Sequence, residues 1–522
     1  MNFSDGCSRD WFVVTGEQQG RIDQRACAEG ATTRQLMESA GSNAARLILE
    51  GSFPRRVVVL AGKGGNGGDA LVLARRFIEH GIDVRVFVPC PKEGLSPETA
   101  AMASLLEAIL PESLHIVGED LSPLREAFTW GDCVIDGLVG CGIDRPLTGR
   151  YAQMVELINE APLRTISLDL PSGLPSDRGR LVGSAIRADM TIAMAFLKPA
   201  HLLYPARSYC GSVKIAGVDY PREVLKEFSP LARVLTPCGA KALLPARRPD
   251  GHKGTFGRVL VIAGSIGMSG AAILCCRGAL RAGTGLVTLA GPRALNPIFA
   301  TALPEVVTLP LPDRGGHLCS SSIARLRAAF ARVDVVAIGP GLSRARTVGR
   351  LVRRSLLASE VPLVLDADGL FHLAQHLDLL RRVTGRAVLT PHPGELSHIM
   401  GQSVEKIDED RIAVAQAVAS EHGVVLVLKG RPTAIGFPDG EVYLNPTGNT
   451  GLATGGSGDV LTGLIAGFMA GGASPADAAV VGTYVHGYAA DWLTRTRAER
   501  AILPTDLLEA LPYAIAEVER CG

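Results

Sequence analysis

The chain has almost no charge imbalance and no long apolar run. Among its 522 residues, 53 Lys and Arg stand against 52 Asp and Glu, which leaves a net charge of +1. We therefore expect no nucleic-acid partner held by phosphate neutralisation. No apolar run approaches the roughly 18–20 residues that cross a bilayer, so we expect no membrane association. Residues 1–10 carry two acids and no apolar signal core, which predicts a cytoplasmic location.

Cysteine pairs and aromatic residues are also scarce. The 11 cysteines are odd in number and form no CxxC motif, which predicts reduced thiols acting mostly as small buried apolar side chains. Aromatic residues make up only 5%, whereas glycine is abundant at 60 residues. So much glycine fits tight turns where the backbone approaches a ligand.

Short β-branched runs alternate with amphipathic stretches in two successive series. The first series predicts strands at 56–60, 84–88, 133–135 and 165–170, with helices at 69–80 and 97–109. The second predicts strands at 258–262, 286–289, 334–338, 362–365 and 424–428. Apolar strands separated by helices indicate parallel sheets covered on both faces. The fold class is therefore α/β, as two tandem three-layer αβα domains at 1–235 and 236–522, and the Pro-bearing stretch 237–249 is the best linker candidate.

A glycine-rich loop follows the first strand of the first series. Residues 62–69 read GKGGNGGD and lead into a helical run, which is the geometry that binds a phosphate or nucleotide at a helix N-terminus. Loops 136–142 and 169–173 follow two more strands. Because the carboxyl ends of parallel strands share one edge, we expect these loops to bring together Asn66, Asp69, Asp136, Asp169 and Ser172. The alternative is that the acids only form turns or cap helices.

A denser glycine signal lies in the second half. Residues 449–461 read NTGLATGGSGDVL and open an apolar helical stretch. Backbone N–H groups of 455–458 can hold a transferring phosphoryl group, and Asp459 is placed to take a proton from a substrate hydroxyl. Otherwise Asp459 only complements the helix dipole. Loops 366–369, 390–395 and 429–433 also follow strands, and His392 lies between two prolines in a position that favours substrate contact over a structural role.

The first half, over roughly residues 10–220, resembles NAD(P)H-hydrate epimerases in its three loops and in the segment LMESAG at 36–41. The resemblance implies a Rossmann-like fold and a K⁺ site at Asn66, Asp136 and Ser172. Gly65 and Lys63 stand where that family usually has Asn and Pro. It also implies that the hydrated nucleotide is bound by Gly65, Asn66, Gly67, Gly68, Asp69, Gly140, Cys141, Gly142, Ile143, Asp144, Arg145, Pro146, Tyr151 and Asp169.

The second half, over roughly residues 240–515, resembles ribokinase-like proteins and, more narrowly, the ADP- or ATP-dependent NAD(P)H-hydrate dehydratases. The motifs, in order, are HKG at 252–254, AGS at 263–265, TPHPGE at 390–395, KG at 429–430 and the loop 449–461. The resemblance implies hydrate contacts from Ala272, Gly341, His392 and Asp459, and adenine-nucleotide contacts from Lys429, Gly430, Arg431, Pro432, Thr433 and Gly458. Mg²⁺ would enter with ADP or ATP, since no all-protein cage for it is visible. The whole chain then resembles the bifunctional NAD(P)H-hydrate repair enzymes, which implies small-molecule substrates and a homo-oligomer.

This chemistry needs particular groups. Phosphorylation of the ring hydroxyl of the hydrate creates a good leaving group, and the ring nitrogen can then expel phosphate. Epimerisation needs an acid/base residue, for which we expect Asp169 rather than Asp69, because Asp69 begins the expected helix and would be held as a cap.

The alternative function is a ribokinase-like small-molecule kinase with an N-terminal nucleotide-binding or interaction module.

Overall fold

The structure is a computed structural model that describes residues 8–51, 54–111 and 113–521. It divides into two compact units, one from Trp11 to Leu231 and the other from Ala232 onward, with residues 8–10 belonging to the second. Strand β1 (Asp10–Val13) spans the point where the chain passes from the second unit to the first. In the described ranges no helix is both long and apolar enough to cross a membrane. The cysteines in those ranges form no disulfide with one another.

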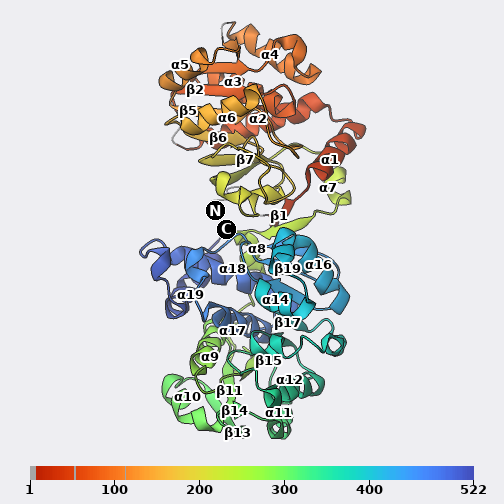
Figure 1. The fold of residues 1–522 in the computed structure, drawn as a ribbon, viewed down its shortest axis with the longest axis vertical. Coiled ribbons are helices and arrows are strands. Elements are labelled where there is room, and N and C mark those ends of the chain that lie inside the picture. The colour runs from red at the N-terminus through yellow and green to blue at the C-terminus, as the bar shows by residue number, and fades with distance from the viewer. Residues whose placement is uncertain (1–7, 52–53, 112, 522) are drawn as a thin grey trace. The chain divides into compact units, whose positions relative to one another are not determined.

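The first unit is built on a seven-stranded parallel sheet in the order β4-β3-β2-β5-β6-β7-β8. Its strands are β2 (Arg56–Ala61), β3 (Asp83–Val88), β4 (Leu114–Ile116), β5 (Cys133–Gly137), β6 (Arg164–Leu168), β7 (Met190–Met194) and β8 (Ser212–Ala216). Its helices are α1 (Gly16–Ala28), α2 (Thr33–Leu49), α3 (Gly65–Glu79), α4 (Pro97–Ile109), α5 (Ser122–Trp130), α6 (Arg150–Glu160) and α7 (Arg222–Glu227) (Figure 1).

Both faces of this sheet are covered, as alternation along β2 shows. Val57 and Val59 join the core formed with α2, α3 and α4, whereas Val58 and Leu60 join the core formed with α5 and α6. Successive side chains of a strand point to opposite faces, so a strand that is apolar throughout must lie between two helical layers. The three-layer αβα architecture follows.

The second unit has a larger mixed sheet. From β9 inward its order is β9-β20-β19-β18-β17-β16-β15-β10-β11-β12, parallel from β12 to β18, with β19 antiparallel to both β18 and β20. Its strands are β9 (Ala232–Leu235), β10 (Arg258–Ile262), β11 (Leu286–Pro292), β12 (Val307–Leu311), β15 (Val335–Ile338), β16 (Leu363–Leu365), β17 (Ala387–Leu389), β18 (Val425–Leu428), β19 (Ala434–Gly436) and β20 (Val442–Leu444), besides the separate hairpin β13 (Asp313–Arg314) and β14 (His317–Leu318). Its helices are α8 (Pro237–Leu243), α9 (Ser269–Arg281), α10 (Asn296–Ala302), α11 (Ile323–Phe330), α12 (Arg346–Ala358), α13 (Asp368–Phe371), α14 (Pro393–Met400), α15 (Val404–Glu409), α16 (Arg411–His422), α17 (Ser457–Ala470), α18 (Pro475–Leu493) and α19 (Pro504–Glu519).

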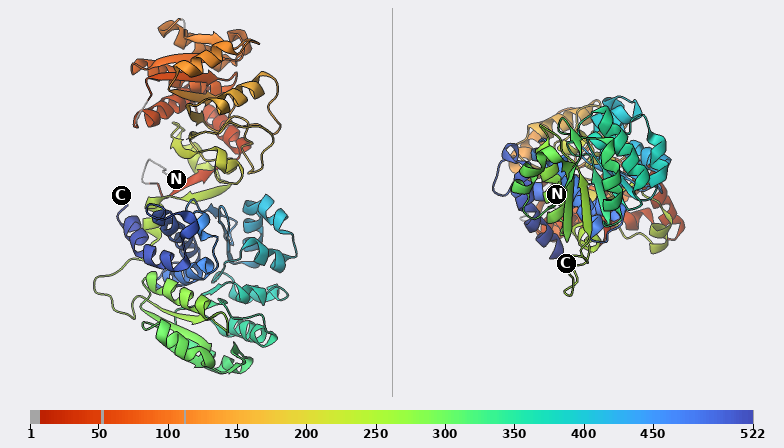
Figure 2. Two further views of the ribbon diagram at one scale, coloured as in Figure 1. Left: turned by 60° about the vertical axis from the view of Figure 1, so that its left-hand side comes forward. Right: turned by 90° about the horizontal axis from the view of Figure 1, so that it is seen from below.

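Helix α17 is the central element of this unit. Every residue from Val460 to Ala470 is buried, because α9, α18 and the sheet surround it. A helix that is apolar all round is stable only in such a setting. Seen from below in Figure 2, the green strands of this sheet lie between the blue helices and the teal ones. The sheet is therefore covered on both faces here as well.

The predicted αβα fold is confirmed, but two local predictions are wrong. The expected linker at 237–249 contains helix α8, in which Thr236 caps the N-terminus, Pro237 occupies the first turn and Ala240 is buried. Proline at the first helical position is favourable rather than disruptive. Helix α3 begins at Gly65, four residues before the expected start at 69, because its glycines pack closely against other elements.

Candidate active sites

A cleft of about 1090 Å³ opens in the first unit at the carboxyl ends of its central strands. It lies where the strand order reverses between β2 and β5, the place where ligands bind in open α/β sheets. Lys63 and Gly64 from the first glycine loop line it as well. Of the residues predicted to bind substrate, the lining includes Gly65, Asn66, Asp69, Gly140, Cys141, Gly142, Ile143, Asp144, Arg145, Pro146, Tyr151 and Asp169.

Gly67 and Gly68, also predicted to bind substrate, are buried in α3 instead. A Cβ on Gly67 would lie 1.9 Å from the Gly62 carbonyl oxygen, and one on Gly68 would lie 2.3 Å from the Met37 sulfur. Their backbone N–H groups donate to the Gly64 carbonyl. These glycines therefore let α3 pack against the loop and α2, which presents the first turn of the helix to the cleft.

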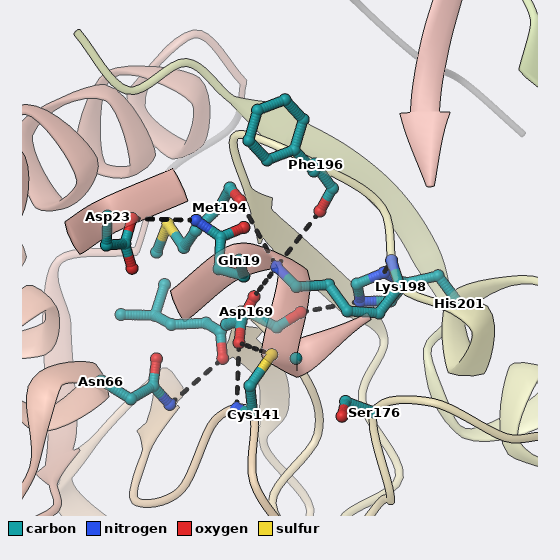
Figure 3. Close-up of polar contacts among 12 residues, drawn as sticks. Gln19, Asp23, Asn66, Cys141, Asp169, Ser176, Met194, Phe196, Lys198 and His201 are labelled. Atoms are coloured by element: carbon teal, nitrogen blue, oxygen red, sulfur yellow. Dashed lines mark hydrogen bonds and ion pairs between the residues drawn. The ribbon is translucent and has the colours of Figure 1, made fainter. Parts of the chain in front are cut away.

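A buried ion pair lies against this cleft (Figure 3). The Lys198 ammonium, fully buried, donates to Asp169 Oδ1 at 2.7 Å and to the Met194 and Phe196 carbonyls at 3.4 and 3.3 Å. The other carboxylate oxygen, Oδ2, accepts the backbone N–H and the thiol of Cys141, each at 3.1 Å. The Asp169 carboxylate is therefore held in one orientation by three hydrogen bonds, one from Lys198 and two from Cys141.

Charge pairing sets the ionisation of the two partners. Burial alone would raise the pKa of the Asp169 carboxyl, but the Lys198 ammonium outweighs it and lowers that pKa below its ordinary value. Burial likewise opposes the charge of Lys198, yet Asp169 raises the lysine pKa. His201 binds the backbone of both residues: its Nδ1 accepts the backbone N–H of Lys198 at 2.9 Å, and its Nε2 lies 2.7 Å from the Asp169 carbonyl oxygen.

Asp69 is not the helix cap that the sequence suggested. The N-cap of α3 is Gly64, and Asp69 lies in the second turn with its side chain lining the cleft. Burial, followed by the charges of Asp169 and Asp23, holds the pKa of the Asp69 carboxyl well above its usual range. Our reason for preferring Asp169 over Asp69 is therefore wrong, although Asp169 stays a candidate base.

The predicted potassium residues lie partly beneath this cleft. Asp136 is fully buried and accepts hydrogen bonds from Ser167, from the backbone and hydroxyl of Ser172, and from the Leu138 N–H. Asn66 donates its amide N–H to the Leu168 carbonyl at 3.2 Å, while its buried Oδ1 accepts no hydrogen bond within the described residues. An unpartnered amide oxygen and a buried carboxylate that accepts only from neutral donors are both ligands suited to a hard monovalent cation.

The sequence analysis missed Lys198 and Asp23, which both line the cleft. Asp23 comes from α1 and accepts the Tyr220 hydroxyl at 2.5 Å and the Gln19 amide at 3.2 Å. The only signal for Lys198 in the sequence is a charged residue that ends the apolar run 190–197 and precedes a proline. Asp23 carries no local signal, because it is one acid in a polar helix.

In the second unit, the loop that was predicted to bind a phosphoryl group ends at the N-terminus of α17. Gly456 caps this helix with φ +102°, a backbone conformation that favours glycine, and Asp459 lies in the first turn. Asp491 of α18 holds the start of this loop, since its carboxylate accepts the Gly448 N–H at 2.8 Å and the Asn449 side-chain amide at 3.1 Å. The unpaired N–H groups of the first turn are therefore presented at a fixed position.

Lys429 connects this helix start to two strand ends. Its ammonium donates to Asp366 Oδ1 at 2.8 Å and lies 3.7 Å from Glu395 Oε2. Asp366 Oδ2 in turn accepts the Thr462 hydroxyl of α17 at 2.6 Å. Burial and then the Asp366 charge raise the pKa of Asp459 to about 7, although Lys429 opposes the shift. A carboxylate with such a pKa is suited to accept a proton near neutral pH.

The remaining predicted nucleotide residues, Gly430–Thr433, continue from Lys429 in one loop, and Gly458 lies beside it. A Cβ on Gly458 would be 3.2 Å from the Lys429 ammonium. The Thr433 hydroxyl donates to the Gly430 carbonyl at 3.1 Å. The buried Arg411 guanidinium donates to the Leu428, Lys429 and Pro432 carbonyls at 3.1, 2.7 and 3.2 Å.

His392 caps α14, where its Nδ1 accepts the Gly394 and Glu395 N–H groups. Its side chain is 57% exposed, so the ring is open to a ligand on its other side. Ala272 is fully buried beneath Gly264, and the Gly341 carbonyl accepts the Ser265 hydroxyl at 2.8 Å. A contact of Ala272 with substrate would therefore have to involve its backbone.

The HKG motif at 252–254, which supported the dehydratase resemblance, lies away from the Asp459 site. His252, Lys253 and Gly254 precede β10, at the amino ends of the parallel strands, whereas Asp366 and Lys429 follow β16 and β18 at the carboxyl ends. The motif lines a separate pocket of about 410 Å³ with Arg258 and Arg332. It contributes nothing to the Asp459 site of its own chain.

Both halves of the chain match described families. Residues 259–513 match the NAD(P)H-hydrate dehydratase family, and residues 33–200 match the YjeF-related protein N-terminus family. A solved ADP/ATP-dependent NAD(P)H-hydrate dehydratase from Bacillus subtilis, co-crystallised with ATP and Mg²⁺, is 33% identical with a TM-score of 0.47, over 54% of this chain and 98% of that chain.

Curated relatives span the full length. The bifunctional NAD(P)H-hydrate repair enzyme Nnr of Moorella thermoacetica is 39% identical over 97% of this chain and 97% of the relative. The same-named protein of Thermofilum pendens is 35% identical over 95% of this chain and 94% of the relative. These full-length relatives and the two family models together show that this chain belongs to the family of bifunctional NAD(P)H-hydrate repair enzymes.

Proposed function

We propose that the two predicted domains divide the repair of hydrated NADH and NADPH between them. Residues 1–235 interconvert the R and S hydrates, and residues 236–522 dehydrate the S hydrate with ADP or ATP. The hydrates, formed when water adds across a ring double bond, are the substrates, and NADH or NADPH is the product. Cytoplasmic location and a homo-oligomeric state stay predictions from the sequence.

In the epimerase cleft, Asp169 is the group that accepts a proton, because Lys198 keeps its carboxyl ionised. The first turn of α3, with Gly65 and Asn66, receives a phosphate of the nucleotide at its N–H groups. Lys63 and Arg145 on the cleft lining add positive charge there. Asn66, Asp136 and Ser172 would hold K⁺, which neutralises the buried carboxylate beneath the loop.

In the dehydratase site, Asp459 takes the proton of the ring hydroxyl as the phosphoryl group arrives. The first-turn N–H groups of α17 stabilise the charge on that group, and Lys429 meets the nucleotide phosphates. Mg²⁺ would enter with the nucleotide and bind mainly to its phosphates.

The observation that carries this proposal is the presence of two distinct sites in one chain, each with an aspartate of shifted pKa beside the carboxyl ends of parallel strands. The test is recovery of reduced-nicotinamide absorbance from a mixture of both hydrates with ADP or ATP and Mg²⁺. We expect full recovery with the unmodified protein. With Asp169→Asn, recovery should stop at the fraction of the mixture that is S hydrate. With Asp459→Asn, no absorbance should be recovered.

Two results would contradict the proposal. Full recovery by Asp169→Asn at the rate of the unmodified protein would remove Asp169 from the epimerase. A stable phosphorylated product in place of NADH or NADPH would favour the small-molecule kinase.

A further inference from the structure

The epimerase cleft contains more carboxyl groups than its positive charge can balance. Four aspartates line it, Asp23, Asp69, Asp144 and Asp169, against three cations, Lys63, Arg145 and Lys198. Asp23, Asp69 and Asp169 interact electrostatically with one another, and Lys198 is the cation that interacts with all three. The other titratable groups beside them are the Cys141 thiol, the Tyr220 hydroxyl and the His201 imidazole. None adds positive charge at neutral pH, because burial lowers the pKa of His201 to about 4. Like charges in a buried site cannot all ionise, so at least one of these carboxyls binds a proton at neutral pH.

Hydrogen bonds identify the neutral group. Asp169 accepts Lys198 and Cys141, and Asp23 accepts Tyr220 and Gln19. The Asp69 carboxyl accepts no hydrogen bond from the residues that the structure describes, although it lines the cleft. Donors stabilise the ionised form of a carboxyl, and their absence leaves the neutral form favoured.

From this geometry we propose that Asp69 is a second catalytic residue of the epimerase, the general acid that acts opposite the Asp169 carboxylate. This inference rests on the proposed epimerase function and assigns the proton donor of that reaction. Two carboxyls whose surroundings separate their protonation states are the usual basis for dividing acid and base roles. The burial that raises the pKa of Asp69 agrees with this role.

The chemistry balances without any further reagent. The hydroxyl carbon of the hydrate is bonded to the ring nitrogen. Asp69 donates its proton to the hydroxyl, the C–O bond breaks, water leaves, and the nitrogen lone pair forms an iminium. A second water then adds to the opposite face, its proton passes to Asp169, and the electron pair returns to nitrogen. One water leaves and one enters, and proton exchange with water in the cleft restores both carboxyls.

The experiment follows epimerisation by the full chain in ¹⁸O-labelled water, with Asp69→Asn, which keeps the side-chain shape but cannot supply an acidic proton. We expect label to enter the hydrate at the epimerisation rate in the unmodified protein. Asp69→Asn should lower kcat by at least about 100-fold. It should also remove the alkaline limb of the kcat/KM profile and leave the acid limb, which belongs to Asp169. The matched control is Asp83→Asn, at an exposed acid of the same unit. Unchanged dehydration of the S hydrate by each variant checks that the chain is folded.

The outcomes separate this inference from the function on which it rests. If the unmodified protein epimerises but Asp69→Asn keeps the alkaline limb or stays within a few-fold, Asp69 is not the acid and the epimerase stands. Epimerisation without ¹⁸O incorporation would overturn C–O cleavage and the role of Asp69 with it. If the unmodified protein does not epimerise, both the proposed function of this unit and the inference fail.

Discussion

Asp459 and Asp169 both lie beside the carboxyl ends of parallel strands, yet their surroundings shift their pKa values in opposite directions. Burial and the neighbouring Asp366 raise the pKa of Asp459, whereas Lys198, bonded directly to Asp169, outweighs burial and lowers the pKa there. The distance to the nearest ammonium decides the sign, since a charge in direct contact offsets desolvation. The same residue type therefore works in two different pH ranges.

At this residue scale, the dehydratase should lose activity as the pH falls. A base must be deprotonated, and the Asp459 pKa of about 7 places the acid limb of kcat/KM near pH 7. Asp366→Asn should move that limb to lower pH, because it removes a negative neighbour and frees Lys429 to act on Asp459. The measurement is kcat/KM for the S hydrate from pH 5 to 9. An acid limb that stays in place in Asp366→Asn would contradict this assignment.

At the scale of secondary-structure elements, the conformation of the loop that follows β18 depends on the buried Arg411 side chain. Gly430 has φ +143°, and a Cβ there would lie 2.4 Å from an Arg411 nitrogen, so the loop is folded directly over the guanidinium. Arg411 begins α16 and bonds three carbonyls of the loop or the strand before it. It thereby holds the backbone at Lys429 in position.

Arg411→Lys should therefore raise the KM for ADP or ATP by about tenfold while kcat falls less, because the loss of two charged hydrogen bonds loosens the nucleotide loop. Initial rates over a nucleotide series test this. Arg281→Lys, at an exposed arginine of α9, is the matched control. An unchanged KM in a folded Arg411→Lys protein would show that the loop is held by other contacts.

For the whole molecule, each site is assembled within one unit that has its own sheet and core. The hydrate is a small molecule that diffuses between protein molecules. Asp169→Asn and Asp459→Asn should therefore complement each other when mixed, and together they should recover all of the NADH or NADPH from a hydrate mixture. If the mixed variants recover only the fraction that is S hydrate, the two sites must act within one chain.

The local sequence pattern was enough to predict the bounds of those strands and helices that are defined by their own residues. The strand at 258–262 and the helix at 97–109 agree with β10 and α4 residue for residue, since an apolar run and a Ser-Pro start define them by themselves. The order of the motifs also sufficed for the family. It did not suffice for α8, because a polar segment that contains proline resembles a linker until α18 and α19 pack against it.

What the sequence by itself determined is the αβα fold, the two glycine-rich loops and the family, because these follow from periodicity and from residues adjacent in the chain. Only the tertiary structure decided the proton chemistry of the first site. Lys198 meets Asp169 from 29 residues away, and Asp69 faces the cleft because Gly67 and Gly68 allow α3 to start early. A pKa depends on burial and on charges a few ångströms away, and neither is a property of the local sequence.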